Sequence, residues 1–189
     1  MAKDMSNEYS SIVRDVGKVL KKQIRQSDTK ITLFLLGPGD NSKSNGRQLR
    51  SFLQKKCEKF GIVVKGEHKE LIKIFHKETE SMLNLCIMER WFAEKFATAV
   101  IIIPDSPGSL VELGMFVFNK KLYKKTLLLF STAYSEDGFI TKGPKSHYKL
   151  KRTSMERIDY GKKKEAWEIV ENFLLPFKAE KMEKALLRS

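Results

Sequence analysis

The stretch AVIIIPDSPGSLVELGMFVF, residues 99–118, predicts a strand, a tight turn and a helix in immediate succession. Residues 101–103 are an unbroken run of isoleucine, which is typical of a strand covered on both faces in a parallel sheet. Residues 104–108 supply the turn, and we expect the helix to begin near Ser109, a good N-cap residue. The unit is a β–α corner whose turn lies at the carboxyl edge of a sheet, where open α/β sheets bind ligands.

Apolar segments on either side of this corner continue the alternation of strands and helices. That alternation over residues 31–131 predicts a parallel sheet with right-handed crossovers. We therefore expect an α/β fold, Rossmann-like or flavodoxin-like, with about five strands and helices on both faces. The predicted strands are 31–36, 61–65, 99–103, 126–131 and an edge strand at 155–160; the predicted helices are 47–60, a long region within 69–95, one from 109, and 166–177.

The length of 189 residues, 41% of them hydrophobic, suits a single domain with a sizeable core. We expect one domain over residues 1–189, with a leading amphipathic helix within 1–28 and a charged tail at 178–189. Two cysteines, Cys57 and Cys86, favour a reducing cytoplasm over a disulfide framework. The polar start and the lack of a long apolar run predict a cytoplasmic protein without membrane contact.

The net charge of +13 favours partners that carry phosphate. Residues 142–164 concentrate it, with nine basic against two acidic side chains. This segment either contacts a nucleic-acid backbone or forms a solvated rim. The candidate nucleic-acid contacts are Lys142, Lys145, Lys149, Lys151, Arg152, Lys162, Lys163 and Lys164.

A glycine-rich loop, GPGDNSKSNG at residues 37–46, follows the first predicted strand. Doubly wound folds use this loop to meet phosphate or ribose, although this one fits neither the Walker nor the dinucleotide fingerprint. It is either a plain connection or a binding loop, with Gly37, Gly39 and Asp40 as candidates. Glu67 follows the second predicted strand and is a candidate at the same edge.

The two acids of the corner allow more than one interpretation. Ser109 and Glu112 fit the S-x-x-E capping box, in which Glu112 serves only to start the helix. Alternatively, Glu112 faces a sugar and attacks its anomeric carbon or stabilises an oxocarbenium ion, while Asp105 orients ribose hydroxyls or handles a proton. Ser106, Gly108 and Ser109 are then candidates for substrate binding. His68 and His76 have no third ligand at a metal-like spacing, so no metal site is predicted.

The segment VIIIPDSPGSLVELGMF resembles the signature of nucleoside 2-deoxyribosyltransferase-like proteins, in particular the toxic effectors of bacterial retron anti-phage systems. The likeness extends to ITLFLLGPGD at 31–40 and, more faintly, to GFITKGP at 138–144. The resemblance implies that Glu112 is the nucleophile and that Asp105 assists at the sugar. It also implies cleavage or transfer at the N-glycosidic bond of a nucleoside, a nucleotide or NAD, with NAD as a substrate and no metal or other cofactor.

The resemblance further implies assembly with retron-type DNA or RNA and a reverse transcriptase, as a homo-oligomer or within a larger complex. Family members commonly place an aspartate where this chain has Thr98, which puts that residue's role in holding the base in doubt. Larger retron effectors continue into a DNA-binding domain, so here we expect any DNA contact to fall to residues 142–164. A non-catalytic module that senses a nucleotide or binds nucleic acid, and a scaffold that assembles with a partner, are the alternatives.

Overall fold

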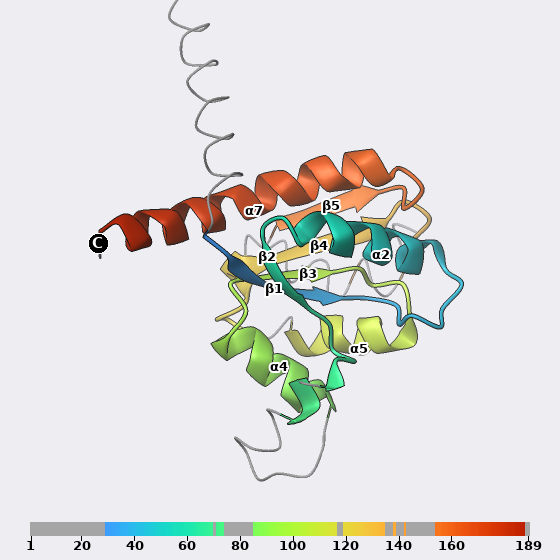
Figure 1. The fold of residues 1–189 in the computed structure, drawn as a ribbon. Coiled ribbons are helices and arrows are strands. Elements are labelled where there is room, and N and C mark those ends of the chain that lie inside the picture. The colour runs from blue at the N-terminus through green and yellow to red at the C-terminus, as the bar shows by residue number, and fades with distance from the viewer. Residues whose placement is uncertain are drawn as a thin grey trace, which may run out of the picture.

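A computed structural model describes residues 29–69, 71–73, 85–116, 119–134, 138, 142 and 154–187. Its centre is a sheet of five strands: β1 (Ile31–Leu36), β2 (Gly61–Val64), β3 (Ala99–Ile102), β4 (Thr126–Ser131) and β5 (Ser154–Ile158). Every neighbouring pair is parallel, and the spatial order is β2-β1-β3-β4-β5 (Figure 1). This order is the flavodoxin-like arrangement of a doubly wound fold, so the predicted α/β class is confirmed.

The strand order contains one reversal of direction, between β1 and β3. From β1 the chain steps outward to β2 and then returns to the other side of β1, where Leu36 pairs with Ile102. The segments that leave the carboxyl ends of β1 and β3 therefore diverge, and a crevice opens between them. This geometry determines where a ligand can enter the fold.

Helices cover both faces of the sheet (Figure 1). One face packs against α2 (Asn45–Cys57) and α7 (Lys163–Leu186), and the other packs against α4 (Leu85–Lys95) and α5 (Pro107–Phe116). A short 3-10 helix, η1 (Tyr123–Lys125), leads into β4. All four residues of β3 are buried, as expected for a central parallel strand with helices on both sides.

The ends of several helices differ from the sequence prediction. The helix of the acidic corner begins at Pro107 rather than near Ser109, and α2 spans Asn45–Cys57 rather than 47–60. The largest difference is α7, which continues to Leu186 through most of the predicted tail. Nothing in the alternation of apolar residues marks that continuation, because its stabilising contacts are made by lysines.

Those contacts attach the end of α7 to the rest of the fold. Lys178 is only 1% exposed, and its Nζ lies 5.6 Å from the centre of the Phe60 ring. The Nζ of Lys181 donates a hydrogen bond to the carbonyl of Lys30 at 2.6 Å. The predicted leading helix at 1–28 and nearly all of the basic segment before β5 lie outside the described residues. Within the described part of the chain, no helix has the length and apolar character needed to cross a bilayer.

Candidate active site

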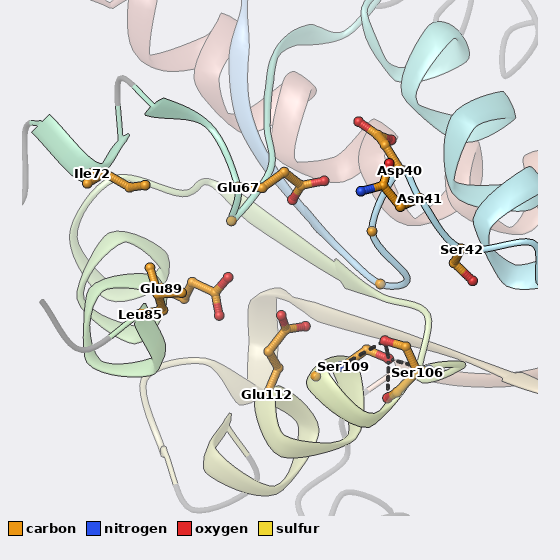
Figure 2. Close-up of a pocket in the computed structure, with 14 residues that line it drawn as sticks. Asp40, Asn41, Ser42, Glu67, Ile72, Leu85, Glu89, Ser106, Ser109 and Glu112 are labelled. Carbon is orange, nitrogen blue, oxygen red and sulfur yellow. Dashed lines mark hydrogen bonds between the residues drawn. The ribbon is translucent and has the colours of Figure 1, made fainter.

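A pocket of about 540 Å³ opens at the carboxyl edge of the sheet, at the reversal between β1 and β3 (Figure 2). Its walls come from the segments that follow β1, β2 and β3, together with α4 and α5. The volume lies within the usual range of small-molecule sites. The lining residues are Gly37, Gly39, Asp40, Asn41, Ser42, Gly66, Glu67, Ile72, Leu85, Glu89, Ser106, Gly108, Ser109 and Glu112.

Most residues singled out from the sequence meet in this pocket. Glu112 and the seven predicted binding residues all line it, although they come from three different strand ends. The single exception among these candidates is Asp105, which is absent from the lining. The roles of all these residues in binding or catalysis stay predictions.

The start of α5 is capped without any help from Glu112. The Oγ of Ser106 accepts a hydrogen bond from the backbone N–H of Ser109 at 3.2 Å, and the Oγ of Ser109 accepts one from the N–H of Ser106 at 2.9 Å (Figure 2). This is the reciprocal pattern of a capping box with serine in both positions and Pro107 as the first helical residue. The capping interpretation of Glu112 is therefore wrong, because the box starts three residues earlier than the spacing suggested.

Glu112 is consequently available to the pocket. Its Oε2 is buried and has no hydrogen-bond partner among the described residues. Burial raises the pKa of Glu112 to about 8, and the negative charge of Glu89 contributes in the same direction, while the Arg50 guanidinium opposes both. A buried carboxyl oxygen without a partner is costly in a folded protein and is a common mark of a functional group.

Glu89, on α4, is the second carboxyl of the site, and the sequence analysis missed it. It is 8% exposed and points toward Glu112 in Figure 2. Burial raises its pKa to about 7, against the opposing effect of its interaction with Glu112. The raised pKa values of both carboxyls favour their protonated forms, so the pair holds at least one proton near neutral pH. The sequence signal of Glu89 is an acid placed between the buried Met88 and Phe92 on the apolar face of α4.

Gly66 makes room for Glu89. A Cβ atom on Gly66 would lie 1.7 Å from the Oε1 of Glu89, far inside any allowed contact. Gly66 follows β2 and lines the pocket, so the carboxyl of Glu89 rests directly against the backbone there. A side chain at position 66 would therefore displace the Glu89 carboxyl from its present place in the pocket.

Arg50, on α2, holds several groups at the pocket wall through hydrogen bonds. The sequence analysis did not predict this residue. It is 3% exposed and donates to both carboxylate oxygens of Glu67, at 2.7 and 2.9 Å. It also donates to the carbonyls of Leu35 and Pro38. Burial works against ionisation of Glu67, but the Arg50 guanidinium outweighs it and holds the pKa of that carboxyl below its ordinary value. Glu67 is thus an ionised acceptor fixed in place at the pocket wall.

Lys65 makes the second ion pair at this wall. Its Nζ lies 2.8 Å from the Oδ2 of Asp40 and 3.7 Å from the Oε1 of Glu67. The hydrogen bond from Lys65 lowers the pKa of Asp40. Because Arg50 and Lys65 already have carboxylate partners, the pocket presents acidic groups to a ligand. Such a surface suits sugar hydroxyls and a developing positive charge.

Asp105 faces away from this pocket, toward α2. Its Oδ2 accepts a hydrogen bond from the backbone N–H of Gly46 at 2.9 Å, and its Oδ1 is 3.5 Å from the hydroxyl of Tyr134. Thr98 lies at the other end of β3, where it pairs with Thr32 through both its backbone and its side chain. Thr98 is therefore far from the pocket edge of the sheet.

None of the basic candidates that the structure describes lines the pocket. Lys162, Lys163 and Lys164 lie at the start of α7, where Lys162 and Lys164 are exposed and Lys163 is half-buried. Lys142 is also exposed. The other four candidates, Lys145, Lys149, Lys151 and Arg152, lie outside the described residues. Over the part of the chain that the structure describes, no three histidine, cysteine or acidic side chains group as metal ligands would.

The fold and the pocket define a class: a flavodoxin-like α/β protein with a carboxylate-lined ligand site at its topological switch point. A family model described as "STM3845 retron effector protein" matches residues 42–186, and the chain belongs to this family of retron effectors. It is also 31% identical over 141 residues to an Escherichia coli protein named "Retron Ec86 putative ribosyltransferase/DNA-binding protein". That alignment covers 68% of this chain and 41% of the relative, so the chain spans less than half of the relative's length.

Proposed function

We propose that this protein cleaves or transfers at the N-glycosidic bond of a nucleoside, a nucleotide or NAD, as an effector of retron defence against phage. The observation that carries the proposal is the carboxyl of Glu112, which is buried at the pocket, free of any capping role and without a hydrogen-bond partner on Oε2 among the described residues. Membership of a retron effector family and the word ribosyltransferase in the relative's name support it.

In the proposed reaction Glu112 is the nucleophile. Its carboxylate oxygen bonds to the anomeric carbon while the carbon–nitrogen bond to the base breaks, and the bonding electron pair leaves with the base. Water or a second base then attacks the same carbon and releases the sugar from Glu112. The first acceptor gives hydrolysis and the second gives transfer. The proposal includes no metal and no cofactor, and NAD enters only as a substrate.

Glu89 supplies the proton in this proposal. Burial raises the pKa of both carboxyls, so the pair keeps a proton that can move from Glu112 to Glu89 at the cost of a partly buried negative charge on Glu112. The positive charge that develops on the sugar favours ionised Glu112 and offsets this cost. Glu89 can then protonate a departing purine or pyrimidine base, the division of labour seen in paired carboxyl sites, whereas nicotinamide leaves NAD as a neutral molecule and needs no proton.

The remaining walls hold the sugar and the groups attached to it. Glu67 and Asp40 are kept ionised by Arg50 and Lys65, which makes them acceptors for ribose hydroxyls. Gly37 and Gly39 line one side of the pocket, and Ser106, Gly108 and Ser109 line the other, where we place their contacts with the substrate. With these assignments, the binding residues proposed from the sequence contact one substrate in one cavity.

The decisive measurement is release of free base, followed by mass spectrometry, from NAD and a panel of nucleosides and nucleotides. We expect Glu112→Gln to fold normally and to lose about 10²- to 10⁴-fold of the wild-type rate, the usual effect of removing a positioned catalytic group. Glu168→Gln, on the exposed side of α7, is the matched control and should keep full activity. A folded Glu112→Gln protein with wild-type turnover would exclude the mechanism.

A second candidate function is nucleic-acid binding, alone or alongside catalysis, within an assembly that includes retron DNA or RNA, a reverse transcriptase or further copies of the chain. The net charge of +13 and the words DNA-binding in the relative's name favour it. It predicts that the logarithm of the association constant for nucleic acid falls linearly with the logarithm of the salt concentration. Replacing Lys162, Lys163 and Lys164 with alanine should reduce that slope by about 0.7 to 0.9 for each phosphate that these lysines neutralise in the wild-type protein. An unchanged slope would remove this segment from the interface.

A further inference from the structure

Asp105 has a defined structural partner in α2. Its Oδ2 accepts the N–H of Gly46, the second residue of the helix, at 2.9 Å. Ser44, the N-cap, accepts the N–H of Arg47 at 3.2 Å. Two backbone donors of the first turn, which the helix itself cannot satisfy, are thereby paired, and one of the acceptors comes from the far side of the crevice. The negative charge of Asp105 also lies at the positive end of the helix dipole.

The fit between Asp105 and Gly46 is tight. A Cβ on Gly46 would lie 2.4 Å from the Oδ2 of Asp105 and 2.5 Å from its Cβ. Gly46 is buried, so the carboxylate packs directly against bare helical backbone. On its other side, Oδ1 lies 3.5 Å from the hydroxyl of Tyr134, which donates its one hydrogen to the carbonyl of Pro104. The Oδ2 oxygen of Asp105 is thus engaged by the backbone of α2, outside the pocket.

The start of α2 controls a pocket wall. Arg50 is one helical turn beyond Gly46, on the same side of the helix. From there it reaches the carbonyls of Leu35 and Pro38 and the carboxylate of Glu67. A shift of the first turn of α2 would therefore move Arg50, and with Arg50 both the β1–α2 loop and Glu67, which it holds by hydrogen bonds.

We propose that Asp105 is a positioning residue, which fixes the start of α2 against the β3–α5 turn and so holds Arg50 and Glu67 at the pocket without itself touching the substrate. The structural part of this inference stands alone, and its consequence for turnover rests on the proposed function. It differs from a role at the sugar in one testable respect. A positioning residue needs an acceptor at Oδ2, whereas a residue that handles a proton needs an ionisable carboxyl.

Asp105→Asn separates the two roles, because asparagine keeps a carbonyl acceptor and loses the acid. We expect Asp105→Asn to retain kcat and KM for base release from NAD within about threefold of wild type, whereas Asp105→Ala raises KM by about tenfold with a smaller change in kcat, as expected when one hydrogen bond is removed. Gly46→Ala should raise KM in the same way although every acid is intact. The exposed Glu168→Gln variant is the control and should match wild type.

Hydrogen–deuterium exchange of peptides covering residues 44–50 tests the same hydrogen bond without any turnover. Protection of the first turn of α2 should be retained in Asp105→Asn and abolished in Asp105→Ala and Gly46→Ala, with thermal unfolding confirming that each variant is folded. If the wild-type protein releases no base, the proposed function fails while this readout still decides whether Asp105 fixes the helix. A protected Asp105→Asn protein that loses turnover as severely as Glu112→Gln would overturn the inference, as would equal protection in all variants.

Discussion

The pocket contains two carboxyl groups with raised pKa values, those of Glu112 and Glu89. Glu89 is buried, Glu112 is half-buried with its Oε2 covered, and each shifts the pKa of the other. Among the described residues, no cation holds either of them in the way that Arg50 holds Glu67. A protein keeps such a pair at a cost in stability, since an isolated, buried carboxylate is expensive. The cost is consistent with a catalytic purpose.

The loss of stability caused by the Glu89 and Glu112 carboxyls should appear in how the free energy of unfolding depends on pH. The folded-state pKa values of about 7 and about 8 lie above the ordinary value of 4.5, so the folded protein binds more protons than the unfolded chain in that window. The free energy of unfolding should therefore fall as pH rises from about 4.5 to about 8, by at most about 1.4 kcal/mol per pH unit for each carboxyl. Urea denaturation at a series of pH values measures this directly.

Variants of the pair provide the control for that experiment. Glutamine cannot ionise, so Glu112→Gln should have a shallower pH dependence than wild type, and Glu89→Gln with Glu112→Gln a shallower one still. Glu168→Gln, on the exposed side of α7, should follow the wild-type curve. A wild-type stability that rises over the same pH range would show that the pair is ionised in the folded protein.

The first turn of α5 illustrates how a helix cap determines which side chains are left for chemistry. Ser106 and Ser109 satisfy each other's backbone N–H groups, so the acid on the next turn has no capping duty. Had the helix begun at Ser109, Glu112 would have been drawn back to the backbone. The position of one cap residue thus decides whether a carboxyl faces the helix or the pocket.

This assignment predicts different stabilities for two substitutions within one helix. Ser106→Ala removes a cap acceptor and should lower the free energy of unfolding by about 1 kcal/mol. Glu112→Gln removes no cap and should raise that free energy at pH 7 and further at pH 8, because the wild-type carboxyl, whose pKa is raised in the fold, loses stability relative to glutamine as pH rises above about 4.5. Urea denaturation of both variants at pH 7 and pH 8 makes the comparison. A destabilised Glu112→Gln protein with an unaffected Ser106→Ala protein would restore the capping interpretation.

Arg50 connects distant parts of the molecule at the switch point. From α2 it hydrogen-bonds the end of β1, the loop that follows it and the carboxylate of Glu67 beyond β2. The pocket therefore depends on the assembled sheet and is built by no single segment. In this respect it is typical of doubly wound folds, whose sites arise where neighbouring connections separate.

Arg50→Ala should be among the more damaging single changes in the protein. It leaves two buried carbonyls without this donor and Glu67 without its bidentate partner, and we expect a loss of about 2 kcal/mol in the free energy of unfolding. The loss is smaller than for a fully buried pair because the Glu67 side chain is 42% exposed. Arg90→Ala, which breaks an exposed pair with Glu94 on α4, should cost less than about 0.5 kcal/mol. Equal effects of the two variants, measured by urea denaturation, would contradict the assigned role of Arg50.

Local sequence was sufficient to predict the strands, since runs such as residues 31–36 and 126–131 coincide with observed strands in the sheet. It also pointed to the pocket residues that follow β1, β2 and β3, because parallel strands end at a common edge. It could not predict Arg50 or Glu89. A buried arginine on α2 and a buried acid on α4 give no periodic signal of their own, and the residues that they contact are distant in sequence.

The sequence by itself determined the alternation of elements, the parallel sheet and the edge at which ligand-binding groups collect, because burial pattern and turn chemistry are local properties. Only the tertiary structure decided which groups each acidic side chain contacts. It showed that Glu112 shares its pocket with Glu89, while Asp105, seven residues from Glu112 in the chain, turns to the backbone of α2. Asp105 and Glu112 are close in sequence but contact different groups, whereas Glu89 and Glu112 are far apart in sequence but share one pocket. The reason is that hydrogen-bond partners and burial are set by the packed fold.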